Sequence, residues 1–198
     1  PEASVAAPVA WACSALAAEG GGVALAVTVA AVHALVARGK VGHVGPSNVR
    51  AWRTARVAEM CRAMGLQPPV VCQPPYNAMS RLIETELLPC CDHYGVGVVS
   101  YSPLARGVLT GKYQPGAEPE PGSRAARGDK RLHQTEFRQV SLELSQQFQA
   151  HAESRGISPT QFAIAWVLNN QQVNGVIGGP RTLAQWQDYL AALSLKLT

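Results

Sequence analysis

The residues best suited to chemistry follow short apolar runs along the chain. Ser47 and Asn48 follow the run 41–45, and Gln73 closes the run 69–73. Hydroxyl and carboxamide side chains can each donate and accept hydrogen bonds, so this set could bind an amide group. Capping of the strands and of the next helix is the alternative, and the local pattern leaves both open.

Tyr101 closes a third apolar run and is followed by Ser102-Pro103-Leu104. An aromatic ring at such a place could stack on a flat heterocycle or pack in the core. Residues 107–113 (GVLTGKY) partly match a Walker A motif, but the glycine spacing is one residue short and Tyr113 follows Lys112 instead of Ser or Thr. We therefore exclude a P-loop.

The strongest candidate for a phosphate site is the segment 177–182 (IGGPRT), which joins the last apolar run to the last helix. Free N–H groups at a helix N-terminus favour an anion, and Arg181 adds a bidentate donor. A plain helix cap is the alternative.

No nucleophile, acid–base pair or metal site is predicted. The five histidines are scattered, no Cys and His stand at zinc spacing, and Glu84 and Glu86 lie on different helix faces. Residues 124–138 carry five basic residues but also Asp129 and Glu136, with no aromatic residue before Phe137. This composition favours a solvated loop over a nucleic-acid-binding patch.

Elements that would position these residues follow from hydrophobic periodicity and from Gly and Pro. We expect helices over 30–38, 49–64, 80–94, 136–155, 158–170 and 182–193, strands over 41–45, 69–73, 96–101 and 173–177, and a loop over 102–134. Four strand–helix units in a row predict an α/β fold with parallel strands, either half of a (β/α)8 barrel or a doubly wound sheet. In both folds ligands bind beyond the carboxyl ends of the strands.

Composition predicts one globular unit. The chain has 198 residues, 47% of them hydrophobic, and a net charge of +4 that is too small to indicate a nucleic-acid binder without a concentrated patch. Five cysteines without C-x-x-C spacing indicate reduced thiols and a cytoplasmic protein. Residues 23–37 are apolar but short for a membrane span, which needs about 20 residues, and they lack the flanks of a signal peptide.

Five ordered blocks resemble the second half of bacterial aldo-keto reductases: GKVGHVGPSN, QPPYNAMSRLIETELLP, GVGVVSYSPLARGVLTGKY, AIAWVLNN and VIGGPRTLAQWQDYLAAL. The resemblance covers residues 28–198. It implies a partial (β/α)8 TIM barrel, made of the C-terminal four strand–helix units, and reduction of aldehydes or ketones with NADPH.

The resemblance assigns cofactor roles to residues already singled out. It implies that Ser47, Asn48 and Gln73 bind the nicotinamide carboxamide and that Tyr101 stacks on the ring. It implies pyrophosphate contacts for Ser102, Pro103, Leu104, Gly107 and Lys112, 2′-phosphate contacts for Gly179, Pro180, Arg181 and Gln185, and an adenine contact for Asp188. Two positions depart from the family pattern: Tyr189 replaces a common Asn, and Pro46 replaces a small apolar residue.

The same resemblance implies a catalytic Asp, Tyr, Lys and His in the first half of the barrel. The His would fall near residues 16–19, where the sequence is LAAE, and His33 cannot replace it. We expect the Ala/Val/Gly-rich residues 1–27 to resemble no part of the family, and the chain, which starts at Pro1, to be truncated, with negligible activity alone. A small carbonyl compound is then the substrate of the intact parent. The alternative is a non-catalytic nucleotide- or partner-binding remnant that self-associates as a homo-oligomer.

Overall fold

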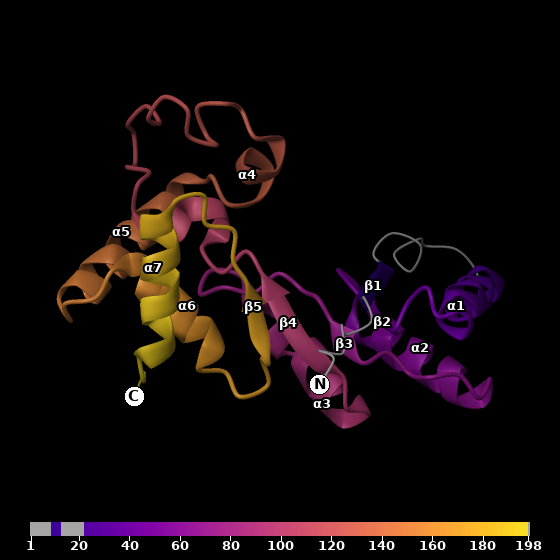
Figure 1. Ribbon diagram of the computed structural model, residues 1–198. Helices are drawn as coiled ribbons and strands as arrows, with labels where there is room; N and C mark the ends of the chain where they lie inside the picture. The colour runs from indigo at the N-terminus through magenta and orange to yellow at the C-terminus, as the bar shows by residue number, and fades with distance from the viewer. Residues whose placement is uncertain (1–8, 13–21, 198) are drawn as a thin grey trace. The chain divides into compact units, whose positions relative to one another are not determined.

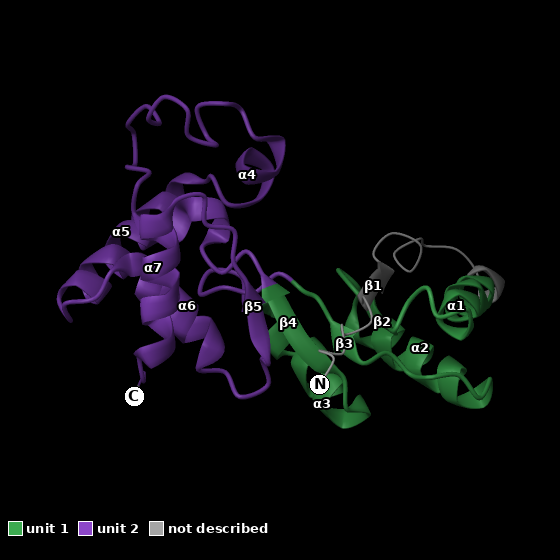
Figure 2. Cartoon of the chain, viewed as in Figure 1, with its two compact units in different colours: residues 1–74, 82–100 green, residues 75–81, 101–198 purple. Residues whose placement is uncertain are grey.

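A computed structural model describes residues 9–12 and 22–197 of the chain. These residues form two compact units (Figure 2). Unit 1 comprises residues 1–74 and 82–100, and unit 2 comprises residues 75–81 and 101–198. Helices and parallel strand pairs make this an α/β fold.

The described residues of unit 1 form two parallel strand pairs and three α-helices (Figure 1). Strand β1 (Val9–Ala12) pairs with β2 (His43–Pro46), with Val9 opposite His43. Strand β3 (Val71–Cys72) pairs with β4 (Gly97–Tyr101), with Val71 opposite Gly97. The helices are α1 (Gly22–Ala37), α2 (Ala51–Ala63) and α3 (Leu87–Tyr94), and a 3-10 turn, η1, spans Leu82–Glu84.

Strand β1 lies in a stretch for which the sequence predicted no element. Periodicity gives no signal there because the segment VAWA is apolar at every position and lies in a longer Ala-rich stretch. The strand forms because it pairs with β2 in parallel. This contact joins segments about thirty residues apart, so the local sequence does not predict it.

The core of unit 1 lies between α1 and α2, where Leu25 and Val29 pack against Val57 and Cys61. Gly45 lets β2 approach its neighbour closely, because a Cβ at this position would collide with the carbonyl oxygen of Val71. Helix α3 ends at Gly95, whose φ of 66° is the left-handed conformation that glycine adopts without strain.

The helix predicted over 80–94 begins later than expected. The Asn77 side chain accepts hydrogen bonds from the backbone N–H groups of Met79 and Ser80, both at 3.0 Å. This local turn competes with helix formation, so only η1 precedes α3 and regular helix starts at Leu87.

Unit 2 contains four α-helices and one strand. The helices are α4 (Lys130–Thr135), α5 (Gln139–Glu153), α6 (Pro159–Leu168) and α7 (Leu183–Ala191); the strand is β5 (Gly175–Ile177), and 3-10 turns η2 and η3 span Ala105–Thr110 and Ala192–Ser194. Helix α6 contacts both α5 and α7 (Figure 1). The predicted cap is confirmed: Ser158 caps α6 with Pro159 in the first turn.

The prediction of a loop over 102–134 holds for 111–129, which contain no helix or strand, but it is wrong for 105–110 and 130–134. This segment contains η2 and most of α4, and it supplies Val108, Leu109 and Leu132 to a buried cluster with Leu142 of α5. Hydrophobic periodicity does not predict these elements. The left-handed residues Arg106 and Gly107 interrupt the helical spacing in η2, and the other apolar residues of the segment are far apart in sequence. Among the described residues, no helix has both the length and the apolar character needed to cross a membrane.

Candidate functional site

A polar cleft of about 340 Å³ lies within unit 2. The end of β4 and the η2 segment form one wall, and the β5–α7 connection with the first turns of α7 forms the other. Predicted cofactor residues make up much of this lining: Tyr101, Ser102, Pro103, Leu104, Gly107, Lys112, Gly179, Arg181, Gln185 and Asp188. The structure thus brings together two stretches that lie about 70 residues apart in sequence.

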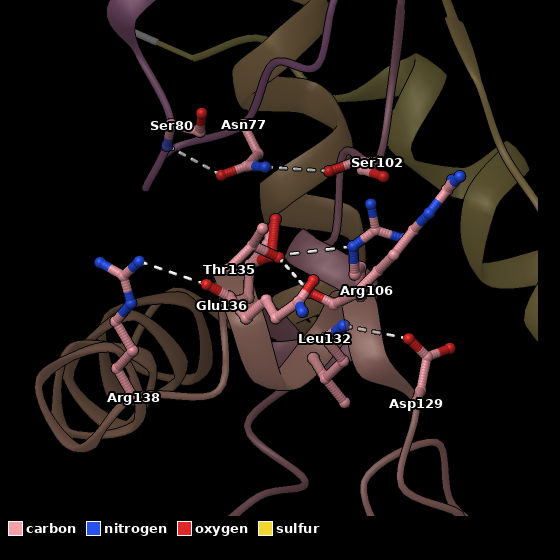
Figure 3. A network of polar contacts seen from close by, with 11 residues as sticks. Asn77, Ser80, Ser102, Arg106, Asp129, Leu132, Thr135, Glu136 and Arg138 are labelled. Carbon is pink, nitrogen blue, oxygen red and sulfur yellow. Dashed lines mark hydrogen bonds and ion pairs between the residues drawn. The ribbon is translucent and has the colours of Figure 1, made fainter.

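The wall after β4 is built from unusual backbone conformations. Ser102, Ala105 and Arg106 adopt φ values of 57°, 47° and 55°, in the left-handed region that non-glycine residues seldom occupy. The Asn77 amide holds this turn by donating to the Ser102 carbonyl oxygen at 3.0 Å (Figure 3). Such conformations persist where surrounding contacts over-determine them, and they are frequent at ligand sites.

Gly107 makes room for the Lys112 side chain. A Cβ on Gly107 would lie 3.0 Å from both Cε and Nζ of Lys112, and the glycine has a φ of 96°. The same ammonium group lies 4.9 Å from the centre of the Tyr113 ring, within the range of a cation–π contact. These two neighbours direct the lysine along the cleft wall.

Four cations and one carboxylate line the cleft within the described residues. The cations are Arg106, Lys112, Arg124 and Arg181, and the carboxylate is Asp188. Arg106 is also paired with Glu136 at 3.8 Å (Figure 3). A cleft with this excess of positive charge attracts an anion, and arginine and lysine both bind phosphate groups.

The β5–α7 connection is ordered by its own side chains. Thr182 caps α7 by accepting from the N–H of Gln185 at 3.2 Å, and the Gln185 side-chain oxygen accepts from the N–H of Arg181 at 2.7 Å. The guanidinium of Arg181 stays exposed beside the helix N-terminus. Pro180 belongs to the same connection, although it does not line the cleft.

Asp188 and Tyr189 lie in the second half of α7. Asp188 accepts from Ser158 Oγ at 2.8 and 3.0 Å and from Gln161 Nε2 at 2.8 Å. The Tyr189 ring lies against Gly178, where a Cβ would meet ring carbons at 3.6 Å. Burial raises the pKa of the Tyr189 phenol above its usual value, although the Gly179 N–H and the Arg124 charge act in the opposite direction.

The remaining predicted residues lie in unit 1. Ser47 forms a parallel bridge with Gln73, is fully buried, and donates from Oγ to the Gln73 carbonyl oxygen at 2.8 Å. Asn48 Nδ2 donates to Ser47 Oγ at 3.2 Å, and Asn48 is left-handed with a φ of 56°. The structure thus brings these three residues together as a neutral polar group at the carboxyl ends of β2 and β3.

Sequence reasoning missed three lining residues of the cleft: Thr110, Arg124 and Thr160. Arg124 is the important omission because it lines the cleft. The expectation of a solvated loop over 124–138 holds for its exposed side chain, but it is wrong for Leu132, which is buried in α4. No local motif marks Arg124. Only the folding of the long segment back toward η2 places it in the cleft.

The position expected for a family histidine, residues 16–19, lies outside the described residues. His33 is buried on α1, with Nδ1 2.8 Å from the Val29 oxygen and Nε2 2.7 Å from the Gln67 oxygen. Both ring nitrogens therefore face backbone carbonyl groups. In the described part of the chain, no three His, Cys, Asp or Glu side chains gather where they could bind a metal ion.

Comparison with known proteins identifies the family. The sequence profile of the Aldo/keto reductase family matches residues 10–198. The chain belongs to this family. An aldo-keto reductase of Pseudocercospora fijiensis (strain CIRAD86) is 35% identical over 156 residues, 76% of this chain and 52% of its own length. Human aldo-keto reductase family 7 member A3 is 34% identical over 83% of this chain and 54% of its own length.

A third relative is named as a channel subunit and not as a reductase. A probable voltage-gated potassium channel subunit beta of Arabidopsis thaliana is 33% identical over 172 residues, 85% of this chain and 52% of its own length. The chain thus spans about half the length of the curated relatives it matches. The family match begins at residue 10, so the expectation that residues 1–27 resemble no part of the family is wrong for residues 10–27.

Proposed function

We propose that this chain carries the NADPH-binding part of an aldo-keto reductase, and that the whole protein reduces small aldehydes or ketones. The observation that carries the proposal is the cleft of unit 2, which is lined by four cations and one carboxylate. A dinucleotide phosphate has phosphate groups in two places, and both walls of the cleft supply cations: Arg106 and Lys112 come from the segment after β4, and Arg181 comes from the β5–α7 connection. Lys112, Arg106 and Arg124 suit the pyrophosphate, and Arg181 suits the 2′-phosphate.

The neutral residues suit the nicotinamide. Ser47, Asn48 and Gln73 provide hydroxyl and carboxamide groups that match a carboxamide, which both donates and accepts. Tyr101, at the end of β4, offers an aromatic face for stacking. We further propose that residues 28–198 make four strand–helix units of a (β/α)8 barrel, and that the protein is cytoplasmic with reduced thiols.

Bound NADPH would supply the hydride for carbonyl reduction. The residues of this chain would hold the cofactor, orient its nicotinamide and neutralise its phosphates. We assign none of them the role of proton donor to the carbonyl oxygen. Removing a general acid typically lowers a rate by about 10² to 10⁴, so we expect the 198-residue chain alone to show negligible turnover.

Titration of the chain with NADPH, followed by nicotinamide fluorescence, tests the proposal. We expect saturable binding, weaker binding of NADH, and a loss of this preference in the variant Arg181→Ala, because Arg181 is assigned to the 2′-phosphate. A bidentate arginine–phosphate contact corresponds to about a tenfold to hundredfold change in Kd. Absence of NADPH binding, or equal binding of NADH and NADPH, would contradict the proposal.

A second candidate is a non-catalytic nucleotide-binding subunit that associates with a partner or with copies of itself. The relative named as a channel subunit beta supports this candidate. The two functions differ in turnover of the whole protein. NADPH oxidation with a reactive aldehyde supports the reductase, whereas NADPH binding without oxidation, together with a homo-oligomer in size-exclusion chromatography, supports the subunit.

A further inference from the structure

Asp188 is the one carboxylate among the described residues that line the cationic cleft, and two side chains at the start of α6 hold it: the N-cap Ser158 and Gln161 in the first turn. Ser158 Oγ donates to its two oxygens at 2.8 and 3.0 Å, and Gln161 Nε2 donates to Oδ1 at 2.8 Å. Both donors bond the same carboxylate and so fix its orientation. An ionised carboxylate can only accept hydrogen bonds, and these three contacts leave it capacity for one more.

Ser158 and Gln161 are themselves oriented by the start of α6. Gln161 N donates to Ser158 Oγ at 3.1 Å, and Ser158 N donates to Gln161 Oε1 at 3.3 Å. The oxygen of each side chain accepts a hydrogen bond from a backbone N–H group. The hydroxyl proton of Ser158 and the –NH₂ group of Gln161 therefore remain available to donate to Asp188. This capping box fixes the direction of the two donors as well as the helix start.

We propose that Ser158 and Gln161 are positioning residues that hold the Asp188 carboxylate as the acceptor for an amino group on the base of the bound nucleotide. This inference rests on the proposed NADPH function. A phosphate is repelled by a carboxylate, so the part of the ligand beside Asp188 is a part that donates. The half-buried ring of Tyr189, the next residue, gives this end of the cleft a flat apolar surface that suits a purine.

A purely structural role for the capping box makes a different prediction. Losing a cap would lower stability and weaken all ligands alike, whereas a positioning role changes the preference between bases. The probe is the reduced hypoxanthine analogue of NADPH, in which a carbonyl oxygen replaces the adenine amino group. An acceptor held at Asp188 binds the amino group and repels the carbonyl oxygen.

The experiment measures Kd for NADPH and for the hypoxanthine analogue by fluorescence, using the 198-residue chain. The unmodified chain should prefer NADPH by about tenfold, the size of one hydrogen bond to a charged group. Gln161→Ala and Ser158→Gly should reduce the preference to about threefold or less. Glycine is tolerated at an N-cap, so Ser158→Gly removes the donor with little loss of helix stability.

Two controls separate positioning from folding. Ser158→Thr retains the hydroxyl and should retain the preference, and Gln187→Ala, an exposed glutamine on α7, should leave it unchanged. An unmodified chain that binds both nucleotides equally, or folded Gln161→Ala and Ser158→Gly variants that keep the full preference, would overturn the inference while the NADPH proposal stands. Failure of the unmodified chain to bind NADPH would overturn both.

Discussion

Similar turns follow two of the strands, but they lead to different polar surfaces in the two units. A polar residue adopts the left-handed conformation in each turn: Asn48 of unit 1 follows β2 with a φ of 56°, and Ser102 of unit 2 follows β4 with a φ of 57°. In unit 1 the neighbouring side chains are neutral, and Ser47 is buried and bonded to the Gln73 backbone. In unit 2 the neighbouring side chains are cations around a cleft.

The difference follows from what comes next in the chain. In unit 1, α2 begins at Ala51 directly after the turn, so the polar residues are held between a strand and a helix. In unit 2, the turn leads into η2 and a long segment that returns Arg124 to the cleft. A short connection gives a rigid, neutral group, and a long connection gives a charged cleft whose shape depends on a folded segment.

The largest expected effect is on the packing of that long segment. Leu132 of α4 is fully buried in the cluster with Val108 and Leu109, so Leu132→Ala should lower the free energy of unfolding by about 2–5 kcal/mol. Urea denaturation of the 198-residue chain measures the loss, with unfolding of unit 2 monitored by hydrogen exchange of its peptides. Leu183→Ala, at an exposed leucine of the same unit, is the control and should cost far less. Equal losses in both variants would show that the segment is not packed as described.

A second comparison uses one glycine from each unit. Gly45→Ala should cost about 3 kcal/mol, the upper end of ordinary overpacking, because its Cβ would collide with the Val71 backbone oxygen. Gly178→Ala meets only the Tyr189 ring at 3.6 Å, an ordinary contact, and should cost less than about 1 kcal/mol. Thermal unfolding of the two variants side by side measures the difference, and a reversed order would contradict the strand contact in unit 1.

Much of the fold was predictable because it depends on local signals. Gly95 and the Ser158-Pro159 pair mark helix ends through backbone conformation and capping, and the structure has the helix boundaries at both. The helix expected from residue 80 was misplaced because Asn77 makes side-chain bonds to the Met79 and Ser80 backbone. Periodicity does not report such competing bonds.

The cleft was only partly predictable. Ser102 and Arg181 follow β4 and β5 closely, where the α/β architecture concentrates ligand sites. Lys112 lies farther along the chain and was assigned only through the family resemblance. Arg124 and Thr160 line the same cleft although neither follows a strand. Their positions depend on long-range packing of the 102–134 segment and of α6, which a single sequence does not specify. The capping box, in contrast, is visible in sequence, but its bonds to Asp188 are not.

The charge of the cleft provides the third test. Arg124→Glu should weaken NADPH binding by about tenfold to hundredfold, and binding to the unmodified chain should weaken as ionic strength rises. Arg127→Glu makes the same charge change on an exposed residue of the same segment and should have a much smaller effect. Ser47→Ala in unit 1 removes a neutral contact, so its effect should not depend on salt. Equal effects of the two arginine variants would mean that net charge, and not the cleft, governs binding.

The smallest expected effect is a difference between the two units in how their stability depends on pH. In unit 1 a hydrogen bond with Cys72, and then burial, raise the pKa of the Cys91 thiol above its ordinary value of about 9.0; in unit 2 burial raises the pKa of Tyr189 above about 10.0. A group with a raised folded pKa stabilises the fold below the unfolded pKa, and this stability is lost as pH rises above it.

Unit 1 should therefore weaken first, from about pH 9, by no more than about 1.4 kcal/mol per pH unit for each thiol. The midpoint of urea unfolding should be lower at pH 9.5 than at pH 8 for the unmodified chain. For Cys91→Ala this difference should be smaller. Tyr189→Phe should follow the unmodified chain over this range, because the unfolded phenol ionises only near pH 10. If Cys91→Ala kept the full slope, the buried thiol pair would not be the group that limits unit 1 at high pH.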